Sequence, residues 1–290
     1  MSRLLVIGRT GQVARALTEQ APGATFLDRA ALDLGSLDAI APAVIAAAPD
    51  IVINAAAYTA VDRAETDRDT AFRINADAVG EIARAADHAG APLIHLSTDY
   101  VYPGTRTGPH LEADPTDPVN TYGASKLAGE RAALAANPRT VILRTAWVYA
   151  PWGRNFVTTM LGLAGRDRLT VVEDQRGQPT SALDIATVCL RIAERLRADA
   201  PVWGVYHVAG REPTTWADFA RAIFREAMAR DLIPKAPEVV GIPTADYPTP
   251  ARRPANSTLD CTAAERTFGL AMTPWPLALA AVLDRMPTAD

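Results

Sequence analysis

Short apolar runs rich in β-branched residues alternate with alanine-rich amphipathic stretches through the first half of the chain, and no other feature constrains its fold as strongly. Strands that alternate with helices form parallel sheets, because each parallel connection must cross back over the sheet. The sequence therefore predicts an α/β fold built on a doubly wound, parallel, Rossmann-type sheet. The predicted strands are residues 4–8, 24–28, 50–56, 91–98 and 140–149, and the helices between them are residues 10–20, 36–48, 73–90 and 120–136.

A glycine-rich turn follows the first predicted strand. Gly8, Gly11 and Ala14 form a G-x-x-G-x-x-A pattern where that strand gives way to a helix. Gly8 permits the tight turn, Gly11 lets the backbone approach a pyrophosphate, and the small Ala14 lets helix and strand pack closely. Asp28 ends the second strand, 20 residues beyond Gly8, where a carboxylate can bind ribose hydroxyls. Together these features predict a dinucleotide site.

The side chains after the second strand leave the choice of cofactor open. Arg29 can bind the 2′-phosphate of NADPH, whereas Asp28 would repel it, so NADPH and NADH both remain candidates. Asp33 fits two roles about equally well, a contact to the adenine or a plain turn or helix-cap residue.

Tyr122 and Lys126 form a Tyr-x-x-x-Lys pattern near the start of a predicted helix, and Thr98 ends the preceding strand. The spacing of four places the phenol and the ammonium on one helix face, where Lys⁺ can stabilise a phenolate whose pKa is normally near 10. The Thr98 hydroxyl can then bond the same substrate oxygen. Tyrosine and lysine at this spacing also pair on ordinary surfaces. Of the 29 lysines and arginines, however, only Lys126 and Lys235 are lysines, which favours the catalytic interpretation.

The regular alternation ends near residue 150, and prolines become frequent, above all in residues 242–254. We expect residues 1–150 to form the dinucleotide-binding domain, with part of residues 175–210 returning to it. Residues 151–290 are then mainly a smaller substrate-binding lobe over the C-terminal edge of the sheet, where open α/β sheets bind ligands.

Eight segments, in order and over nearly the full length, resemble the dTDP-4-dehydrorhamnose reductase family of the extended short-chain dehydrogenase/reductase superfamily. They are GRTGQVARAL, NAAAYTAVDRAE, STDYVYPG, NTYGASKLAGE, RTAWVYA, NF, QPT and YPTPARRPANSTL. Several of them, especially STDYVYPG with RTAWVYA and TPARRP, are narrower than the superfamily signature. The resemblance implies NAD(P)H-dependent reduction of the C4 keto group of dTDP-4-dehydro-L-rhamnose to dTDP-L-rhamnose, in rhamnose biosynthesis for surface polysaccharides.

The resemblance also implies roles for individual residues. It makes Thr98, Tyr122 and Lys126 the catalytic triad. It places Thr98, Asp99, Tyr100 and Trp147 in the sugar-nucleotide pocket, to which we add Arg253 as a candidate contact to the diphosphate. With the glycine pattern, the cofactor-binding residues expected are Gly8, Gly11, Gln12, Val13, Asp28, Asp33, Leu34, Ala57, Tyr58, Thr59, Tyr122 and Lys126.

Some of these positions have an ordinary structural explanation or depart from the family pattern. Trp147 suits core packing as well as sugar contact, and Arg252 and Arg253 suit a solvated loop as well as a diphosphate. Ala14 stands where the family usually has glycine, and Tyr58 stands where some relatives have histidine. The first change is sterically mild, and the second alters the surroundings expected for the nicotinamide.

Two other functions compete with reduction. A sugar-nucleotide dehydratase or epimerase shares the fold, but dehydratases place Asp-Glu after the threonine, whereas Asp99 and Tyr100 follow Thr98 here. A non-catalytic nucleotide-binding regulatory subunit also resembles this family, although Trp147 and the ARRP segment favour a working sugar site.

Charge and hydropathy limit the partners. A net charge of -4 and a pI near 5.6 offer no field for nucleic acid, and prolines and Asp50 interrupt the longest apolar stretch, so we expect no membrane span. We expect a cytoplasmic protein. The resemblance further suggests a homodimer and Mg²⁺, for which the sequence identifies no ligands.

Overall fold

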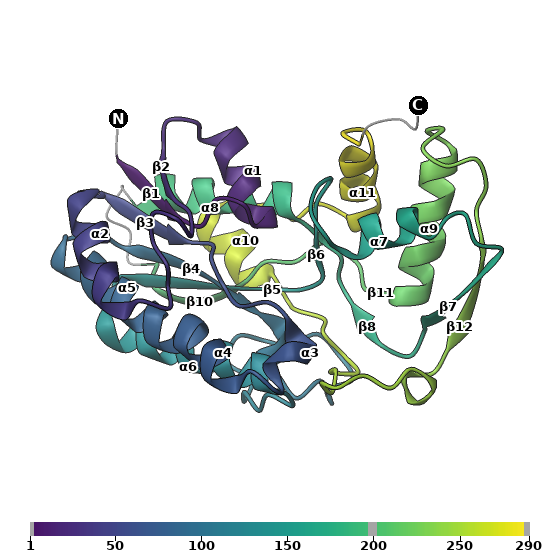
Figure 1. Ribbon diagram of the computed structural model, residues 1–290, viewed down its shortest axis with the longest axis horizontal. Helices are drawn as coiled ribbons and strands as arrows, with labels where there is room; N and C mark the ends of the chain where they lie inside the picture. The colour runs from purple at the N-terminus through teal and green to yellow at the C-terminus, as the bar shows by residue number, and fades with distance from the viewer. Residues whose placement is uncertain (1–2, 197–201, 287–290) are drawn as a thin grey trace.

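The computed structural model describes residues 3–196 and 202–286, which form two lobes (Figure 1). The larger lobe is built on a six-stranded sheet with the strand order β10-β5-β4-β3-β1-β2, in which every described pair is parallel. The predicted doubly wound α/β fold is therefore confirmed. The strands of this sheet are β1 (Leu4–Ile7), β2 (Thr25–Leu27), β3 (Ile51–Asn54), β4 (Leu93–Thr98), β5 (Thr140–Thr145) and β10 (Gly204–His207).

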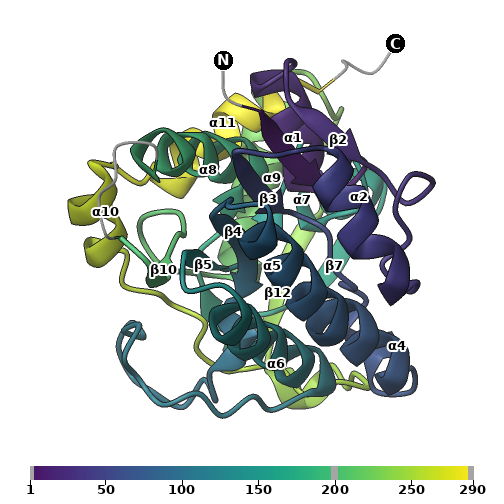
Figure 2. The ribbon, with the colours of Figure 1, turned by 90° about the vertical axis from the view of Figure 1, so that its left-hand side faces the viewer.

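Helices cover both faces of the sheet (Figure 2). One face carries α1 (Gln12–Gln20), α8 (Ala182–Leu196) and α10 (Thr262–Phe268), and the other carries α2 (Ile40–Ala46), α5 (Ala78–His88) and α6 (Thr121–Ala136). Shorter helical segments in the connections are η1 (Leu37–Ala39), α3 (Val61–Ala64), α4 (Arg68–Phe72), the π-helical turn η2 (Arg73–Asp77), η3 (Asp99–Val101) and η4 (Thr244–Asp246).

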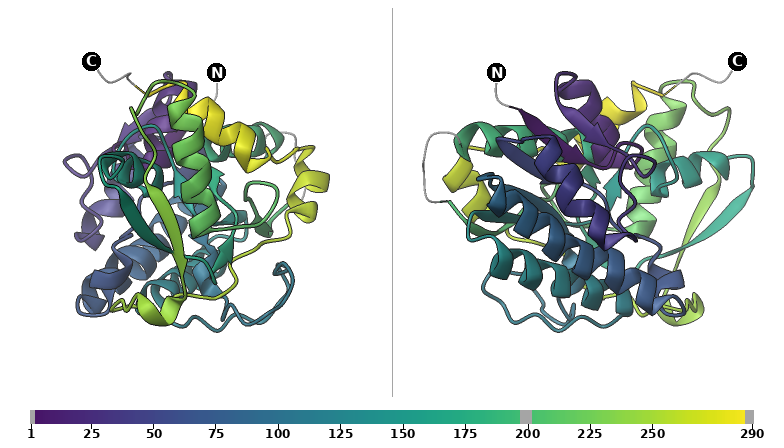
Figure 3. Two further views of the ribbon diagram at one scale, coloured as in Figure 1. Left: turned by 90° about the vertical axis from the view of Figure 1, so that its right-hand side faces the viewer. Right: turned by 60° about the vertical axis from the view of Figure 1, so that its left-hand side comes forward.

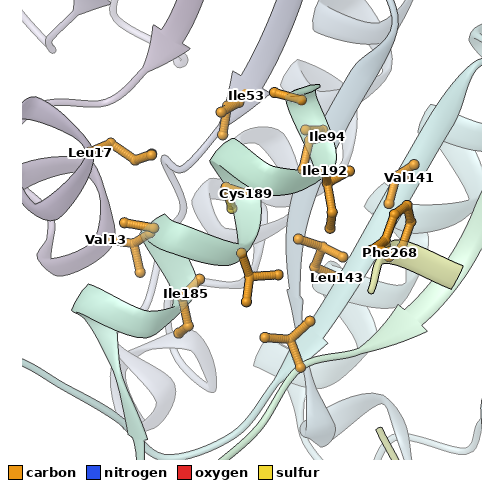
Figure 4. Close-up of a cluster of buried hydrophobic side chains, with 14 of the residues drawn as sticks. Val13, Leu17, Ile53, Ile94, Val141, Leu143, Ile185, Cys189, Ile192 and Phe268 are labelled. Atoms are coloured by element: carbon orange, nitrogen blue, oxygen red, sulfur yellow. The ribbon is translucent and has the colours of Figure 1, made fainter. Parts of the chain in front are cut away.

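Burial explains why the strands are continuously apolar. All four residues of β1 are buried, as expected for a strand covered by helices on both faces. On one side, Val13 and Leu17 of α1 belong to the same apolar cluster as Ile185 and Ile192 of α8 (Figure 4). The second half of the chain thus supplies both a covering helix and the edge strand β10 to the large lobe.

The smaller lobe faces the viewer in the left panel of Figure 3. Its core joins apolar side chains of three helices with those of a two-stranded parallel sheet. Its elements are α7 (Phe156–Gly162), α9 (Trp216–Met228), α11 (Trp275–Leu283), β7 (Arg168–Val172) and β12 (Glu238–Ile242), with the short pairs β6 (Val148–Tyr149) to β9 (Thr180–Ser181) and β8 (Arg176–Gly177) to β11 (Thr214–Thr215).

The structure differs from the sequence prediction at one strand. Residues 140–149 were expected to form one strand, but β5 ends at Thr145, and Trp147 has a left-handed φ of +47°. The chain changes direction there, and β6 pairs with β9 instead of extending the large sheet. The single predicted strand is wrong for this reason.

Among residues 3–196 and 202–286, no helix is both long enough and apolar enough to cross a bilayer.

Candidate functional site

The first turn of α6 is packed directly against the end of β4. Asn120 caps the helix by accepting a hydrogen bond from the backbone N–H of Gly123 at 2.8 Å. A side chain at Gly123 would put its Cβ only 2.1 Å from the carbonyl oxygen of Tyr100. The missing side chain therefore lets α6 approach η3 and brings Tyr122 to the carboxyl end of β4.

Thr98 and Asp99 are buried at this junction, and the partly exposed Tyr122 lies beside them. The Thr98 hydroxyl donates to Asp99 Oδ1 at 2.9 Å and lies close enough to the Tyr122 phenol to affect its pKa. Burial and the nearby Asp99 carboxylate raise the pKa of Tyr122 above its usual value, whereas the Thr98 hydroxyl lowers it. Burial also raises the pKa of Asp99 to about 6, and Asp99 Oδ2 has no hydrogen-bond partner among the described residues. Tyr100 packs its ring edge-on against Tyr122, with centroids 5.8 Å apart.

Lys126 lies one turn further along α6 and is only 2% exposed. Its Nζ donates to the carbonyl oxygen of Leu96 at 2.7 Å and lies 3.2 Å from His95 Nε2. Burial lowers the pKa of Lys126 to about 8, against a smaller effect of Glu130. Lys126 is thus held against β4, and the causes that shift the pKa of Tyr122 in this structure are burial, Asp99 and Thr98.

A cavity of about 540 Å³ runs from these side chains along the carboxyl ends of β1 and β2. It lies where the strand order reverses between β1 and β3, the usual ligand position in doubly wound sheets. The predicted cofactor residues that line it are Gly8, Gly11, Gln12, Val13, Asp28, Asp33, Leu34, Ala57, Thr59, Tyr122 and Lys126. Tyr58 does not line it, and its hydroxyl donates instead to Asp67 Oδ2 at 3.0 Å.

The far end of the cavity has features that suit a dinucleotide. Gly8 has a φ of +104°, and a Cβ there would approach the backbone of Ala55 and Ala56 to 3.4 Å. Asp28 Oδ1 accepts from the backbone N–H groups of Ala30 and Ala31, both at 3.0 Å, which fixes its carboxylate at the wall. Asp33 accepts from Gly35 N–H at 3.0 Å, so it is a turn residue that also lines the cavity.

Two unpartnered polar atoms support the same conclusion. Gln12 Oε1 and Thr145 Oγ1 are buried without a hydrogen-bond partner among the described residues, and both residues line the cavity. Buried polar groups are normally paired, so these atoms fit a polar ligand. Sequence reasoning missed Thr145 and also Arg9, Thr10, Ser97 and Arg154. The positions of Arg9 and Thr10 inside the glycine turn were a usable signal.

On the opposite side, Trp147 follows β5. Its ring stacks on Trp216 of α9, with centroids 3.5 Å apart and planes 8° apart. Gly177 lies against the same ring, since a Cβ there would come within 2.2 Å of Trp147 Cε2. Trp147 therefore packs between the lobes, the ordinary role weighed from the sequence, and its partly exposed ring leaves the sugar contact a prediction.

Arg253 forms a two-pronged ion pair with Asp62 of α3, with Nη1–Oδ1 and Nη2–Oδ2 distances of 2.5 and 2.8 Å. This pair raises the pKa of Arg253 and lowers that of Asp62. Arg252 and Arg253 line a second cavity of about 520 Å³, together with Tyr247 and Gln175. Arg253 is thus not the freely solvated loop side chain that the sequence allowed.

A tyrosine beside a strand-ending threonine, on the wall of a cavity shaped for a dinucleotide, is the arrangement of a nicotinamide-dependent oxidoreductase of the short-chain dehydrogenase class. The family model described as RmlD substrate binding domain matches residues 2–288. The chain belongs to the dTDP-4-dehydrorhamnose reductase family, as the sequence motifs led us to expect.

Individual relatives agree with this assignment. The chain is 46% identical over 279 residues to the dTDP-4-dehydrorhamnose reductase of Sinorhizobium fredii, with 94% of each chain covered. It is similar in structure to a dTDP-4-dehydrorhamnose reductase of Clostridium acetobutylicum, with a TM-score of 0.90, 35% identity, and 97% and 98% of the two chains covered. The reductase of Bacillus anthracis, solved in complex with NADP, has a TM-score of 0.89 and 32% identity, with 98% and 99% covered.

The described residues contain no group of three or more His, Cys, Asp or Glu side chains placed to hold a metal ion. The Mg²⁺ suggested by the resemblance therefore gains no ligands from this part of the chain.

Proposed function

We propose that this protein reduces the C4 keto group of dTDP-4-dehydro-L-rhamnose with NADPH or NADH, giving dTDP-L-rhamnose for surface polysaccharides. The observation that carries the proposal is the position of Tyr122. Its phenol lies beside Thr98, and Tyr122 itself lines the cavity that ends at the Asp28 carboxylate.

In this reaction, each residue of the site would have a separate role. Gly8 and Gly11 give the pyrophosphate access to backbone N–H groups at the start of α1, and Asp28 accepts bonds from the adenosine ribose. The reduced nicotinamide, when bound, supplies a hydride to C4. Thr98 and Tyr122 hold the substrate oxygen, and Tyr122 gives it the proton.

The second cavity suits the nucleotide end of the substrate. We propose that Asp99, Tyr100 and Trp147 contact the sugar and that Arg253 contacts the diphosphate. The Asp62 pair fixes the guanidinium of Arg253 at the wall of this cavity. A fixed guanidinium binds phosphate oxygens with less loss of side-chain entropy than a mobile one. Residues 151–290 would then be mainly the substrate-binding lobe, and residues 1–150, with part of 175–210, the dinucleotide-binding domain.

One experiment tests the assignment directly. Purified protein is given dTDP-4-dehydrorhamnose with NADPH and, separately, with NADH, and the product is identified by mass spectrometry and NMR. We expect oxidation of the reduced cofactor only when the 4-keto sugar nucleotide is present. Dehydration of dTDP-glucose without added reductant would instead identify a dehydratase, and cofactor binding without turnover would identify a regulatory subunit.

Partner and location follow from the same proposal. The sugar nucleotide and the nicotinamide cofactor are both cytoplasmic metabolites, so we propose that the protein works in the cytoplasm. The family resemblance supports a homodimer, and light scattering in the presence and absence of Mg²⁺ tests both the dimer and its metal dependence.

A further inference from the structure

Lys126 belongs to a buried chain of polar groups that runs from α6 across two strands of the sheet. Lys126 Nζ lies 3.2 Å from His95 Nε2 on β4, and His95 Nδ1 lies 3.1 Å from Asn54 Nδ2 on β3. Asn54 and His95 have no exposed surface, and Lys126 is 2% exposed. Each group must therefore satisfy its hydrogen-bonding atoms inside the protein.

The amide of Asn54 determines which nitrogen of His95 carries the hydrogen. Asn54 Oδ1 accepts from the backbone N–H of Ala56 at 3.1 Å, so the amide nitrogen is the atom that faces His95. An amide nitrogen only donates, which makes His95 Nδ1 the acceptor. The ring hydrogen consequently lies on Nε2 and points at Lys126.

This arrangement suits an amine better than an ammonium. An ammonium has only donors, so it would face the Nε2–H of His95 donor to donor across 3.2 Å. An uncharged amine can accept from His95 with its lone pair and still donate to Leu96 at 2.7 Å. We propose that Asn54 and His95 are positioning residues that favour the uncharged form of Lys126 when no cofactor is bound.

The other charged groups around Lys126 do not cancel this effect. Glu130 lies one turn further along α6 and favours the ammonium, but it is bound to Arg144 of β5, with Nη2 and Oε2 2.6 Å apart. Tyr122, one turn earlier, is uncharged because burial raises its pKa. Burial lowers the pKa of His95 well below 6.5, so the ring stays neutral and keeps its single hydrogen.

The kinetic consequence rests on the proposed catalytic role of Lys126. If Lys126 acts with Tyr122, loss of its proton sets the alkaline limb of the kcat/KM profile. The charge of Lys126 can also be measured without turnover, so a failure of this inference can be told from a failure of the proposed function.

The composition of the chain makes that measurement simple. Protein labelled with ¹³C,¹⁵N-lysine gives signals from Lys126 and Lys235 alone, and Lys126→Arg identifies which is which. Exposed Lys235, paired with Asp167, is an internal reference. We expect Lys126 to titrate near pH 8, and ¹⁵N-histidine spectra to show the hydrogen of His95 on Nε2.

Two variants should reverse the direction of the hydrogen bond between position 95 and Lys126, so that Lys126 becomes the donor. In Asn54→Asp, a carboxylate can accept from both Ala56 N–H and His95 Nδ1, which frees Nε2 to accept from an ammonium. In His95→Gln, the amide oxygen can turn to Lys126. Both should raise the titration midpoint of Lys126 by about one pH unit, with the alkaline limb of kcat/KM moving by the same amount. Asn137→Asp adds a carboxyl at another buried asparagine, which bonds to Ala91, and should leave the midpoint in place.

The result that overturns the inference is an unchanged Lys126 midpoint in both folded variants, or a His95 hydrogen on Nδ1 in the unmodified protein. A raised midpoint in a protein that shows no turnover would support the inference and count against the proposed function alone.

Discussion

Lys126 is enclosed between α6 and β4, where its compact amino group fits and a planar guanidinium does not. We expect Lys126→Arg to fold normally and to lose activity by about a hundredfold, with the remaining pH profile moved upward, because positioned acid–base groups contribute on this scale. Lys235→Arg is the matched control, since that side chain is exposed. Steady-state kinetics and circular dichroism of both variants test this, and near-normal kcat in Lys126→Arg would refute the role given to the lysine.

Asp28 lines the cavity, where we expect its charge to discriminate between the two cofactors. We expect Asp28→Ala to weaken NADH binding by about tenfold, the cost of losing hydrogen bonds to a charged group. NADPH should lose less, because the change also removes repulsion of its 2′-phosphate. Fluorescence titration with each cofactor measures this, with exposed Asp38→Ala as control. Equal losses for the two cofactors would mean that Asp28 does not face the ribose.

The catalytic candidates could be predicted from sequence because Tyr122 and Lys126 lie within one helical turn and Thr98 ends a recognisable strand. The partners of Lys126 could not. His95 and Asn54 meet it only because β3 and β4 pair in one register, with Asn54 opposite His95. The local sequence around His95 or Asn54 contains no pattern that predicts this contact.

Among the elements, the first turn of α6 depends on one close approach. In Gly123→Ala, the new Cβ would lie 2.1 Å from the Tyr100 carbonyl oxygen, so the helix must move away from η3 and carry Tyr122 with it. We expect the variant to lose about 1–3 kcal/mol of unfolding free energy, typical of overpacking, together with most of its activity. In Gly162→Ala no atom outside the local helix lies within 4 Å of the new Cβ, which makes it the control. Denaturant unfolding and kcat measure both effects, and a fully active Gly123→Ala would contradict the proposed packing.

Elements with a strong local period were predictable, and α5 shows why. Val79, Ile82, Ala83 and Ala86 recur at helical spacing and are all buried, and Gly90 ends the pattern with a φ of +73°. The break after β5 was not predictable, because Trp147 adopts a left-handed conformation that apolar periodicity does not encode. The pairing of β7 with β12 was also missed, since the two segments are far apart in the chain.

At the scale of the whole molecule, buried histidines link stability to pH. Burial lowers the pKa of His207 to about 3 and also lowers those of His95 and His110, so all three are neutral when folded and gain protons on unfolding. The stability contributed by neutral His207 is then complete above pH 6.5 and falls below it, by about 1.4 kcal/mol per pH unit. Asp99 opposes this trend below about pH 6, because its raised pKa favours proton uptake by the folded state.

A variant isolates one of these contributions. His207→Gln should reduce the slope of unfolding free energy against pH by about 1.4 kcal/mol per unit between pH 6.5 and 5. Exposed His88→Gln should leave the slope unchanged. Urea unfolding at several pH values measures the three proteins. Identical slopes for the original protein and His207→Gln would show that His207 does not titrate on unfolding.

The late position of β10 in the chain affects when this protein can fold during its synthesis on the ribosome. By the time β5 has been made, one face of the sheet still lacks α8, and its apolar residues, such as Val141 and Leu143, have no cover. That face is closed only when α8 and then β10 have left the exit tunnel, and α10 follows still later. We expect stalled nascent chains that end before Gly204 to remain open to protease and to bind chaperones, and chains with a C-terminal extension long enough to bring α10 out of the tunnel to become resistant. Synthesis of the first half of the chain is therefore finished well before the sheet that it forms can be completed.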